Sequence, residues 1–184
     1  KHPAMVALQT GKPVCDYVQG IFNPRIKDYV WIIVNSIPQY SEDTNELSQV
    51  YSTFLDVTQR KRAEGALRQS EARYRELFNS MRDAILVANT DREIIDCNLA
   101  FTDLFGYSLD EIKGCKTHSM YHDINEYWQM GREIQKNMDN PWFLYTINYT
   151  KKDGEVFPGE TNVFYLKNSQ NQVSGYIGMI RDVS

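Results

Sequence analysis

A chain of 184 residues that is 42% hydrophobic and 12% aromatic has enough apolar material for one large core or two small ones. Its net charge of −4 argues against a nucleic-acid partner, because phosphate binding needs clustered, uncompensated Lys and Arg. The chain has no run of about 18 apolar residues and no secretory signal pattern, which predicts a cytoplasmic location without membrane contact in this segment. Three cysteines, Cys15, Cys97 and Cys115, predict reduced thiols rather than a disulfide framework.

The first 58 residues predict the end of a helix followed by three strands. Polar turns separate the three apolar runs, and the last run ends in Asp-Val-Thr at residues 56–58. Residues 141–184 have the same layout: both stretches begin at a proline, Pro13 or Pro141, and the second ends in Asp-Val-Ser. We interpret residues 1–58 as the C-terminal half of a first domain and residues 82–184 as a complete second copy.

This incomplete first copy has an expected structural cost. Three strands without covering helices would expose the apolar run YVWIIV, residues 29–34, and the edge of the last strand. We therefore expect the natural protein to continue upstream of Lys1, or another chain to cover this face. A stable monomer of this chain alone would contradict that expectation.

Residues 59–81 predict a helix, because they lack proline and are rich in strong helix formers after a potential N-cap at Thr58. Spacings of three and four residues, typical of a short coiled-coil seam, connect Leu67, Ser70, Tyr74, Leu77 and Met81. We expect a linker helix that pairs in parallel with a second copy. The alternative is a single amphipathic helix that packs on its own domain.

Residues 82–184 predict an α+β domain. A hairpin over residues 84–97 precedes two short helices, the first capped by Asn98 and the second by a capping box of Ser108 and Glu111. A longer helix over residues 124–138 and three strands follow, with an Asp-Gly hairpin turn at Asp153. This order favours an antiparallel sheet with helices on one face.

Several motifs in this order resemble PAS (sensory box) domains. The block DCNLAFTDLFGYSLDEIKG is similar to the family's strand-Asn-helix-Gly-Tyr-Ser-helix-Gly pattern, KKDGEVFPGE to its hairpin, and DVT and DVS to its closing motif. DVTQRKRAEGAL resembles the join between tandem sensor domains in microbial histidine kinases and diguanylate cyclases. The resemblance implies a five-stranded antiparallel sheet with a small cavity beneath its helices. It also implies a homodimer and a kinase or cyclase output domain on the same chain.

The same resemblance implies that signals pass through the flanking helices. Asp56 and Thr58 would cap the linker helix, so that movement of the preceding strand reaches it. The remaining expected relay residues are the seam positions and the second closing aspartate: Leu67, Tyr74, Leu77 and Asp182. No kinase histidine box, ATP-binding glycine loop or cyclase motif is present in the chain.

Cofactor chemistry is a weaker expectation. Cys115, His118 and His122 would share one face if their segment were helical, which would make a metal site conceivable. His122 also stands where the resemblance places a haem ligand, but the strand expected over residues 142–150 lacks a distal Arg. A flavin photoadduct is disfavoured because Cys115 lacks the neighbouring Asn and Arg, although Trp142 and Asn148 are shared with redox-flavin members.

A small metabolite, or an empty cavity, is the favoured expectation. Strand alternation predicts a lining in which Asn148, Thr161 and the tyrosines would orient a ligand. The full predicted set is Ile85, Val87, Phe101, Tyr127, Trp142, Tyr145, Asn148, Thr161, Val163 and Tyr176. These positions are equally consistent with plain core packing. The sequence thus predicts a non-catalytic sensory and dimerisation module. The alternatives are a ligand-free interaction module and an enzyme based on the Cys/His segment.

Overall fold

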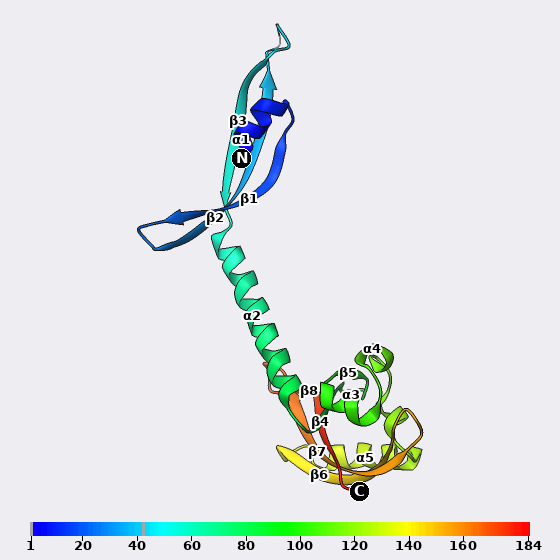
Figure 1. The fold of residues 1–184 in the computed structure, drawn as a ribbon. Coiled ribbons are helices and arrows are strands. Elements are labelled where there is room, and N and C mark those ends of the chain that lie inside the picture. The colour runs from blue at the N-terminus through cyan, green and yellow to red at the C-terminus, as the bar shows by residue number, and fades with distance from the viewer. Residues whose placement is uncertain (1, 42) are drawn as a thin grey trace. The chain divides into compact units, whose positions relative to one another are not determined.

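The computed structural model of the protein describes residues 2–41 and 43–184, which form two compact units, residues 1–72 and 73–184 (Figure 1). A long helix, α2 (Thr58–Ser80), begins in unit 1 and ends in unit 2. It occupies the stretch for which the sequence predicts a helix over residues 59–81. Within the described ranges, none of the helices is long and apolar enough to cross a membrane.

Unit 1 is a three-stranded antiparallel sheet with one short helix against it. The helix α1 (Pro3–Thr10) has proline at its start and ends at Gly11, whose φ of 67° places it in the left-handed region. The strands β1 (Val14–Asn23), β2 (Asp28–Tyr40) and β3 (Leu47–Asp56) pair in the order β1-β2-β3. Helix α1 contacts all three strands and helps to bury Ala7, Val34 and Ser36.

Most large apolar side chains of unit 1 face solvent. Tyr51, Phe54 and Leu55 of β3 are each about 60% exposed, at 61%, 60% and 62%. The aromatic residues Phe22 and Tyr29, on the β1 and β2 strands, are also more than half exposed. This small sheet therefore has little core of its own in a single copy of the chain.

Unit 2 contains a five-stranded antiparallel sheet in the order β5-β4-β8-β7-β6. Its strands are β4 (Ala84–Asn89), β5 (Ile94–Cys97), β6 (Trp142–Thr150), β7 (Val156–Lys167) and β8 (Val173–Asp182). Between β5 and β6 lie α3 (Leu99–Phe105), α4 (Leu109–Ile112), the 3-10 helix η1 (Thr117–Met120) and α5 (Ile124–Lys136). The predicted α+β fold with a five-stranded antiparallel sheet and helices is confirmed.

Local signals explain where these helices begin and end. The Asn98 side chain accepts from the backbone N–H of Phe101 to cap α3, and Gly106, at a φ of 78°, ends that helix. Ser108 and Glu111 form the predicted capping box of α4. The core lies between the helices and one face of the sheet, with Phe101, Phe105 and Phe157 almost fully buried in it.

Candidate functional site

A cavity of about 60 Å³ lies in unit 2 between the sheet and the segment that carries η1 and α5. Most of its wall is apolar and comes from three strands and two helices: Leu86, Ala88, Met120, Met130, Ile134, Val163, Gly178 and Ile180. Six polar side chains complete the wall: Arg92, Thr117, Tyr121, Tyr149, Thr161 and Tyr176. Cavities for drug-sized ligands are about 300–1,000 Å³, so a haem or flavin would have to push these side chains apart.

Of the ten predicted lining residues, Thr161, Val163 and Tyr176 lie on the cavity wall. Thr161 shares a hydrogen bond of 2.7 Å with the buried Tyr149 hydroxyl. The ring of Tyr149 takes the space above Gly159, where any side chain would collide with it. Burial raises the pKa of Tyr149 well above its ordinary value, so the Tyr149–Thr161 pair is neutral.

The predicted positions on β4 are wrong by one residue. Ile85 and Val87 point to the opposite face from Leu86 and Ala88, which line the cavity. Strand β4 is covered on both faces, and both Ile85 and Leu86 are buried. An apolar run of this kind shows no alternation, so the sequence does not tell which residues face inward.

The predicted positions on β6 are also corrected. Trp142 is 50% exposed and Asn148 is exposed, with its side-chain N–H directed to Glu126 at 3.4 Å. Tyr145 packs against the core but does not reach the cavity wall. These three residues are spaced by three along the strand, whereas residues on one face of a strand are spaced by two.

Phe101 and Tyr127 are buried but do not line the cavity. The Phe101 ring stacks on Phe105 at a centroid distance of 4.4 Å and belongs to the main core. Tyr127 instead lies beneath the guanidinium of Arg92, whose carbon is 3.6 Å from the ring centroid. Phe101 and Tyr127 therefore pack in the core, which is the alternative that the sequence left open for the predicted lining residues.

Arg92, which sequence reasoning missed, is the charged group of the cavity wall. It ends the β4–β5 turn with a φ of 60°, a region that residues other than glycine seldom adopt. Its two terminal nitrogens donate to the Tyr127 carbonyl at 2.7 Å and to the Tyr121 hydroxyl at 3.0 Å. An arginine in a polar turn is ordinarily solvent-exposed, so no feature of the sequence indicates that Arg92 turns inward.

Tyr121 is held in its neutral form beside this arginine. Burial raises the pKa of its hydroxyl to about 12, although the positive charge of Arg92 opposes the shift. The neutral hydroxyl accepts the Arg92 N–H and therefore does not neutralise the guanidinium. No carboxylate among the described residues forms an ion pair with Arg92.

Thr117 is the second unexpected residue of the cavity. Its side chain is only 8% exposed, and its Oγ1 has no hydrogen-bond partner among the described residues. Its backbone N–H donates to the carbonyl of Arg92 at 2.9 Å, which fixes the two residues side by side. A buried hydroxyl without a partner is costly and rare in proteins.

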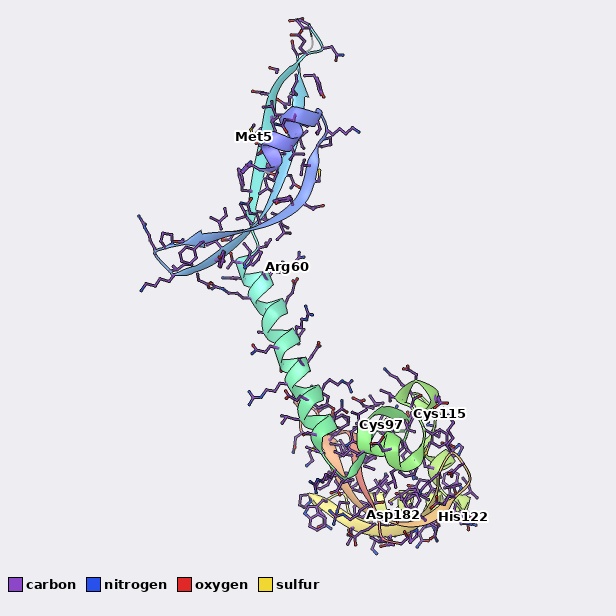
Figure 2. All side chains as sticks on the ribbon, viewed as in Figure 1. Met5, Arg60, Cys97, Cys115, His122 and Asp182 are labelled. Carbon is purple, nitrogen blue, oxygen red and sulfur yellow. The ribbon has the colours of Figure 1, made fainter. Side chains whose placement is uncertain are left out.

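The Cys115, His118 and His122 segment is not a single helix. Cys115 follows Gly114, which has a φ of 81°, and only residues 117–120 form a 3-10 turn. All three side chains are exposed, and Figure 2 shows Cys115 and His122 at separate places in unit 2. In the described part of the chain, no group of three or more His, Cys, Asp or Glu side chains is placed to hold a metal ion.

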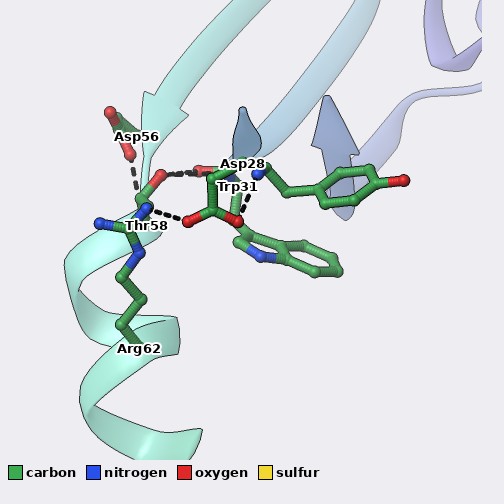
Figure 3. Close-up of polar contacts among 6 residues, drawn as sticks. Asp28, Trp31, Asp56, Thr58 and Arg62 are labelled. Atoms are coloured by element: carbon green, nitrogen blue, oxygen red, sulfur yellow. Dashed lines mark hydrogen bonds and ion pairs between the residues drawn. The ribbon is translucent and has the colours of Figure 1, made fainter. Parts of the chain in front are cut away.

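The predicted relay residues Asp56 and Thr58 link β2 and β3 to the start of α2 (Figure 3). The Asp56 carboxylate accepts the Thr58 N–H at 2.8 Å, and hydrogen bonds from Thr58 lower the pKa of Asp56. Thr58 is not the N-cap: it is the first helical residue, and its hydroxyl accepts the backbone N–H of Trp31 at 2.9 Å. Arg62, one turn later, pairs with Asp28 at the start of β2.

The C-terminal closing motif repeats this geometry. Asp182 accepts the Ser184 N–H at 2.9 Å, and this contact lowers the pKa of Asp182. The residue after each aspartate also donates its N–H to the neighbouring strand: Val57 to Trp31 at 2.8 Å, and Val183 to Pro158 at 3.0 Å. Leu67, Tyr74 and Leu77 of the predicted seam remain 62%, 48% and 57% exposed.

The last turns of α2 are fixed to unit 2 by Asn98. Its side-chain oxygen accepts from Ile85 and Phe101, while its nitrogen donates to the carbonyls of Phe78 and Asp83. An ion pair of 3.0 Å between Arg75 and the mostly buried Asp96 adds a second link to β5. The strand whose Leu86 and Ala88 line the cavity is thereby connected, through Asn98, to the end of α2.

The PAS domain family profile matches residues 82–184, and the chain belongs to this family of sensory domains. Over 119 residues the chain is 34% identical to sporulation kinase E of Bacillus subtilis (strain 168), covering 64% of this chain and 15% of that protein. It is 30% identical over 102 residues to the methyl sulfide methyltransferase-associated sensor of Methanosarcina acetivorans, covering 54% of this chain and 10% of the sensor. The chain thus spans a small part of the length of these relatives.

Solved PAS domains share the fold at lower identity. A PAS domain from Colwellia psychrerythraea has a TM-score of 0.56 at 24% identity and covers 64% of this chain and 97% of its own. The PAS domain of a LuxR-family transcriptional regulator from Burkholderia thailandensis, in complex with ethanol, has a TM-score of 0.52 at 18% identity, with coverage of 60% and 96%. The protein is therefore a PAS-domain protein, similar over part of its length to a sporulation kinase and to a sensor.

Proposed function

We propose that residues 73–184 sense a small molecule in the cavity and report its presence through α2, as part of a longer signal-transduction protein with a kinase output. The observation that carries this proposal is the continuous set of contacts from the cavity wall to the helix. Leu86 lies on the wall, its neighbour Ile85 donates to Asn98, and Asn98 donates to Phe78 of α2.

The cavity wall and the end of α2, which these contacts connect, both have properties that suit a sensor. Among the described residues, Arg92 on the cavity wall has no ion-pair partner and the Thr117 hydroxyl has no hydrogen-bond partner. A ligand that satisfies them would change the packing of β4 against its neighbours, and the end of α2 would respond through Asn98. Similarity to sporulation kinase E supports a histidine kinase as the output, and the ethanol complex of the Burkholderia PAS domain supports a ligand of few atoms.

A ligand-free dimerisation module is the second candidate, favoured by the exposed seam of α2. Leu67, Tyr74 and Leu77 stand on one stripe of α2 and are 48–62% exposed in one copy. Met81, the last residue of the predicted seam, follows the end of the helix at Ser80 and is 46% exposed. We propose that this stripe pairs with that of a second copy, which would bury it. Unit 1, which we propose to be the C-terminal half of another PAS domain, would bring its own exposed strands to the assembly.

The test is native mass spectrometry of the purified chain, with an absorbance spectrum to reveal haem or flavin. We expect a bound species of defined mass, and slower hydrogen exchange at residues 75–80 when that species is present than after its removal. Exchange at residues 59–66 serves as the internal control. A chain that purifies empty, with exchange at residues 75–80 unaffected by any added small molecule, would contradict the sensor and favour the dimerisation module.

A further inference from the structure

We infer that the cavity is a binding site for a small aliphatic monocarboxylate, held at its carboxylate by Arg92 and Thr117. This inference rests on the proposed sensory function and names the chemical class of its ligand. Three features of the cavity support it: the positive charge of Arg92 on its wall, the Thr117 hydroxyl that has no hydrogen-bond partner among the described residues, and the size and apolarity of the remaining space.

The positive charge of Arg92 on the cavity wall favours an anionic ligand. A partly buried guanidinium is usually paired with a carboxylate, because removing a cation from water is costly without an opposite charge. Both hydrogen-bond partners of Arg92, the Tyr127 carbonyl and the Tyr121 hydroxyl, are neutral. The adjacent Glu93 pairs with Lys116 at 3.3 Å instead. Arg92 has five N–H donors, of which these bonds use two, so donors remain for a ligand.

Glu126 on α5 is the other carboxylate to consider as a counter-ion. One of its oxygens accepts from Asn148, and the other is buried without a hydrogen-bond partner among the described residues. It makes no ion pair with Arg92 and does not belong to the cavity wall. Burial is the main cause of the raised pKa of Tyr149, and the charges of Arg92 and Glu126 act on that hydroxyl in opposite directions. Among the described residues no carboxylate is paired with Arg92, which leaves its charge available to an anion in the cavity.

Thr117 supplies the second donor. Thr117 lies on the cavity wall and is more than nine-tenths buried, and its hydroxyl has no hydrogen-bond partner in the described part of the chain. The backbone bond from Thr117 to the Arg92 carbonyl places the two residues side by side, and both line the cavity. A carboxylate has two oxygens, of which one would accept from Arg92 and the other from Thr117, so that both protein groups become satisfied.

The rest of the cavity sets the size and the polarity of the ligand. A cavity needs about 10–15 Å³ to hold one water molecule, which has one non-hydrogen atom. The cavity of about 60 Å³ therefore accommodates a ligand of about four to six non-hydrogen atoms. Beyond the carboxylate the wall is formed by side chains such as Met130, Ile134, Val163 and Ile180, which fit a short hydrocarbon chain. No acidic side chain among the described residues lines the cavity, which disfavours a ligand with an ammonium group.

The experiment is a titration of the full 184-residue chain with sodium propionate and, separately, with propionamide, followed by amide NMR at constant ionic strength. The two molecules have the same number of non-hydrogen atoms and differ in charge. We expect propionate to shift the amide signals around Thr117 and Gly178 and to bind at least about tenfold more tightly than propionamide. Arg92→Gln should reduce propionate affinity about tenfold or more, and Arg132→Gln, which alters an exposed arginine of α5, should leave it unchanged.

A second pair of variants isolates the hydroxyl. Thr117→Val removes an unsatisfied buried oxygen without changing the shape of the side chain, so the apo protein should melt at a higher temperature while propionate binds more weakly. Thr117→Ser retains the hydroxyl and should retain binding. This pair decides the question even if Arg92→Gln fails to fold.

The outcomes separate this inference from the proposed function. Equal affinity for propionate and propionamide, or affinity that survives both Arg92→Gln and Thr117→Val, would overturn the carboxylate site while leaving a small-molecule sensor in place. Binding of neither compound, by a chain that also purifies without any bound small molecule, would overturn both.

Discussion

The three strands β1–β3 of unit 1 and the three strands β6–β8 of unit 2 have the same order, the same antiparallel pairing and the same ending, yet their surroundings differ. Asp56 lies opposite Ile32 in β2, just as Asp182 lies opposite Gly159 in β7. In both β2 and β7, the residues two and four positions after Ile32 or Gly159 are buried. Val34 is thus equivalent to Thr161, and Ser36 is equivalent to Val163.

In unit 2 the equivalent side chains Thr161 and Val163 line the cavity, because β4, η1 and α5 enclose the space in front of them. In unit 1 the helix α1 lies against the corresponding strand, and the large apolar residues of β3 remain exposed. Local sequence patterns are thus sufficient for the strands and their closing motif. A site additionally requires the elements that precede them in a PAS domain.

The largest expected effect comes from replacing one buried aromatic residue in unit 2. Phe105 is fully buried and contacts the rings of Phe101, Tyr149 and Phe157. Phe105→Ala should lower the free energy of unfolding of unit 2 by about 3–5 kcal/mol. The matched change Phe54→Ala in unit 1 alters a residue that is 60% exposed and should cost about 0.5 kcal/mol.

Chemical denaturation of the two variants measures this difference. A loss for Phe54→Ala as large as that for Phe105→Ala would contradict the comparison, because it would mean that the exposed face of β3 is covered in solution. Repeating the measurement over a range of protein concentrations would show whether a second copy provides the cover.

The sequence was sufficient for the fold of unit 2 because its signals are local. The caps at Asn98 and Ser108, the turn at Asp153 and the apolar runs each depend on a few neighbouring residues. Alternation along β7 is a local pattern of the same kind, and Thr161 and Val163 of this strand lie on the cavity wall.

The cavity could be predicted only in part, because its polar groups depend on contacts between distant segments. Thr117 reaches the wall because its backbone pairs with Arg92, 25 residues earlier in the chain. Arg92 turns inward because of a left-handed backbone at the end of the β4–β5 turn, which no residue preference for arginine signals. On β4, burial of both faces removes the alternation that would have distinguished Leu86 from Ile85.

The next effect concerns the connection of α2 to unit 2. Asn98→Ala removes four hydrogen bonds of a side chain that is 1% exposed and leaves their backbone partners unpaired. We expect a loss of about 3 kcal/mol in the stability of unit 2 and faster hydrogen exchange at residues 75–80. Asn79→Ala, which removes a single bond to Leu99 at the same helix end, is the control with a smaller expected loss. Equal effects of the two variants would argue against Asn98 as the main link.

A smaller effect, on assembly rather than stability, is expected at the seam of α2. Leu67→Glu places a charge on the exposed apolar stripe and should weaken self-association at least about tenfold in sedimentation equilibrium. Gln69→Glu adds the same charge outside the seam and should change association little. Unchanged sedimentation of the Leu67→Glu variant would remove the paired-helix hypothesis and leave α2 as a single helix.

The smallest expected effect is a difference in acid sensitivity at Glu111 of unit 2. Hydrogen bonds from Lys152 and from Ser108 lower the pKa of this carboxyl from 4.5 to about 2. Because the folded pKa lies below the unfolded value, Glu111 stabilises the fold above pH 4.5, and this contribution is lost as the pH falls through about 2. Glu111→Gln should therefore lose less stability than the wild type over that interval.

Asp56→Asn gives the corresponding test in unit 1, where contacts with Thr58 also lower the pKa of the Asp56 carboxyl. Acid titrations followed separately by Trp31 fluorescence for unit 1 and Trp142 fluorescence for unit 2, in variants that retain one of these tryptophans, would assign each change to its unit. A Glu111→Gln variant that follows the wild-type acid curve in unit 2 would show that the Lys152 and Ser108 contacts do not persist in solution.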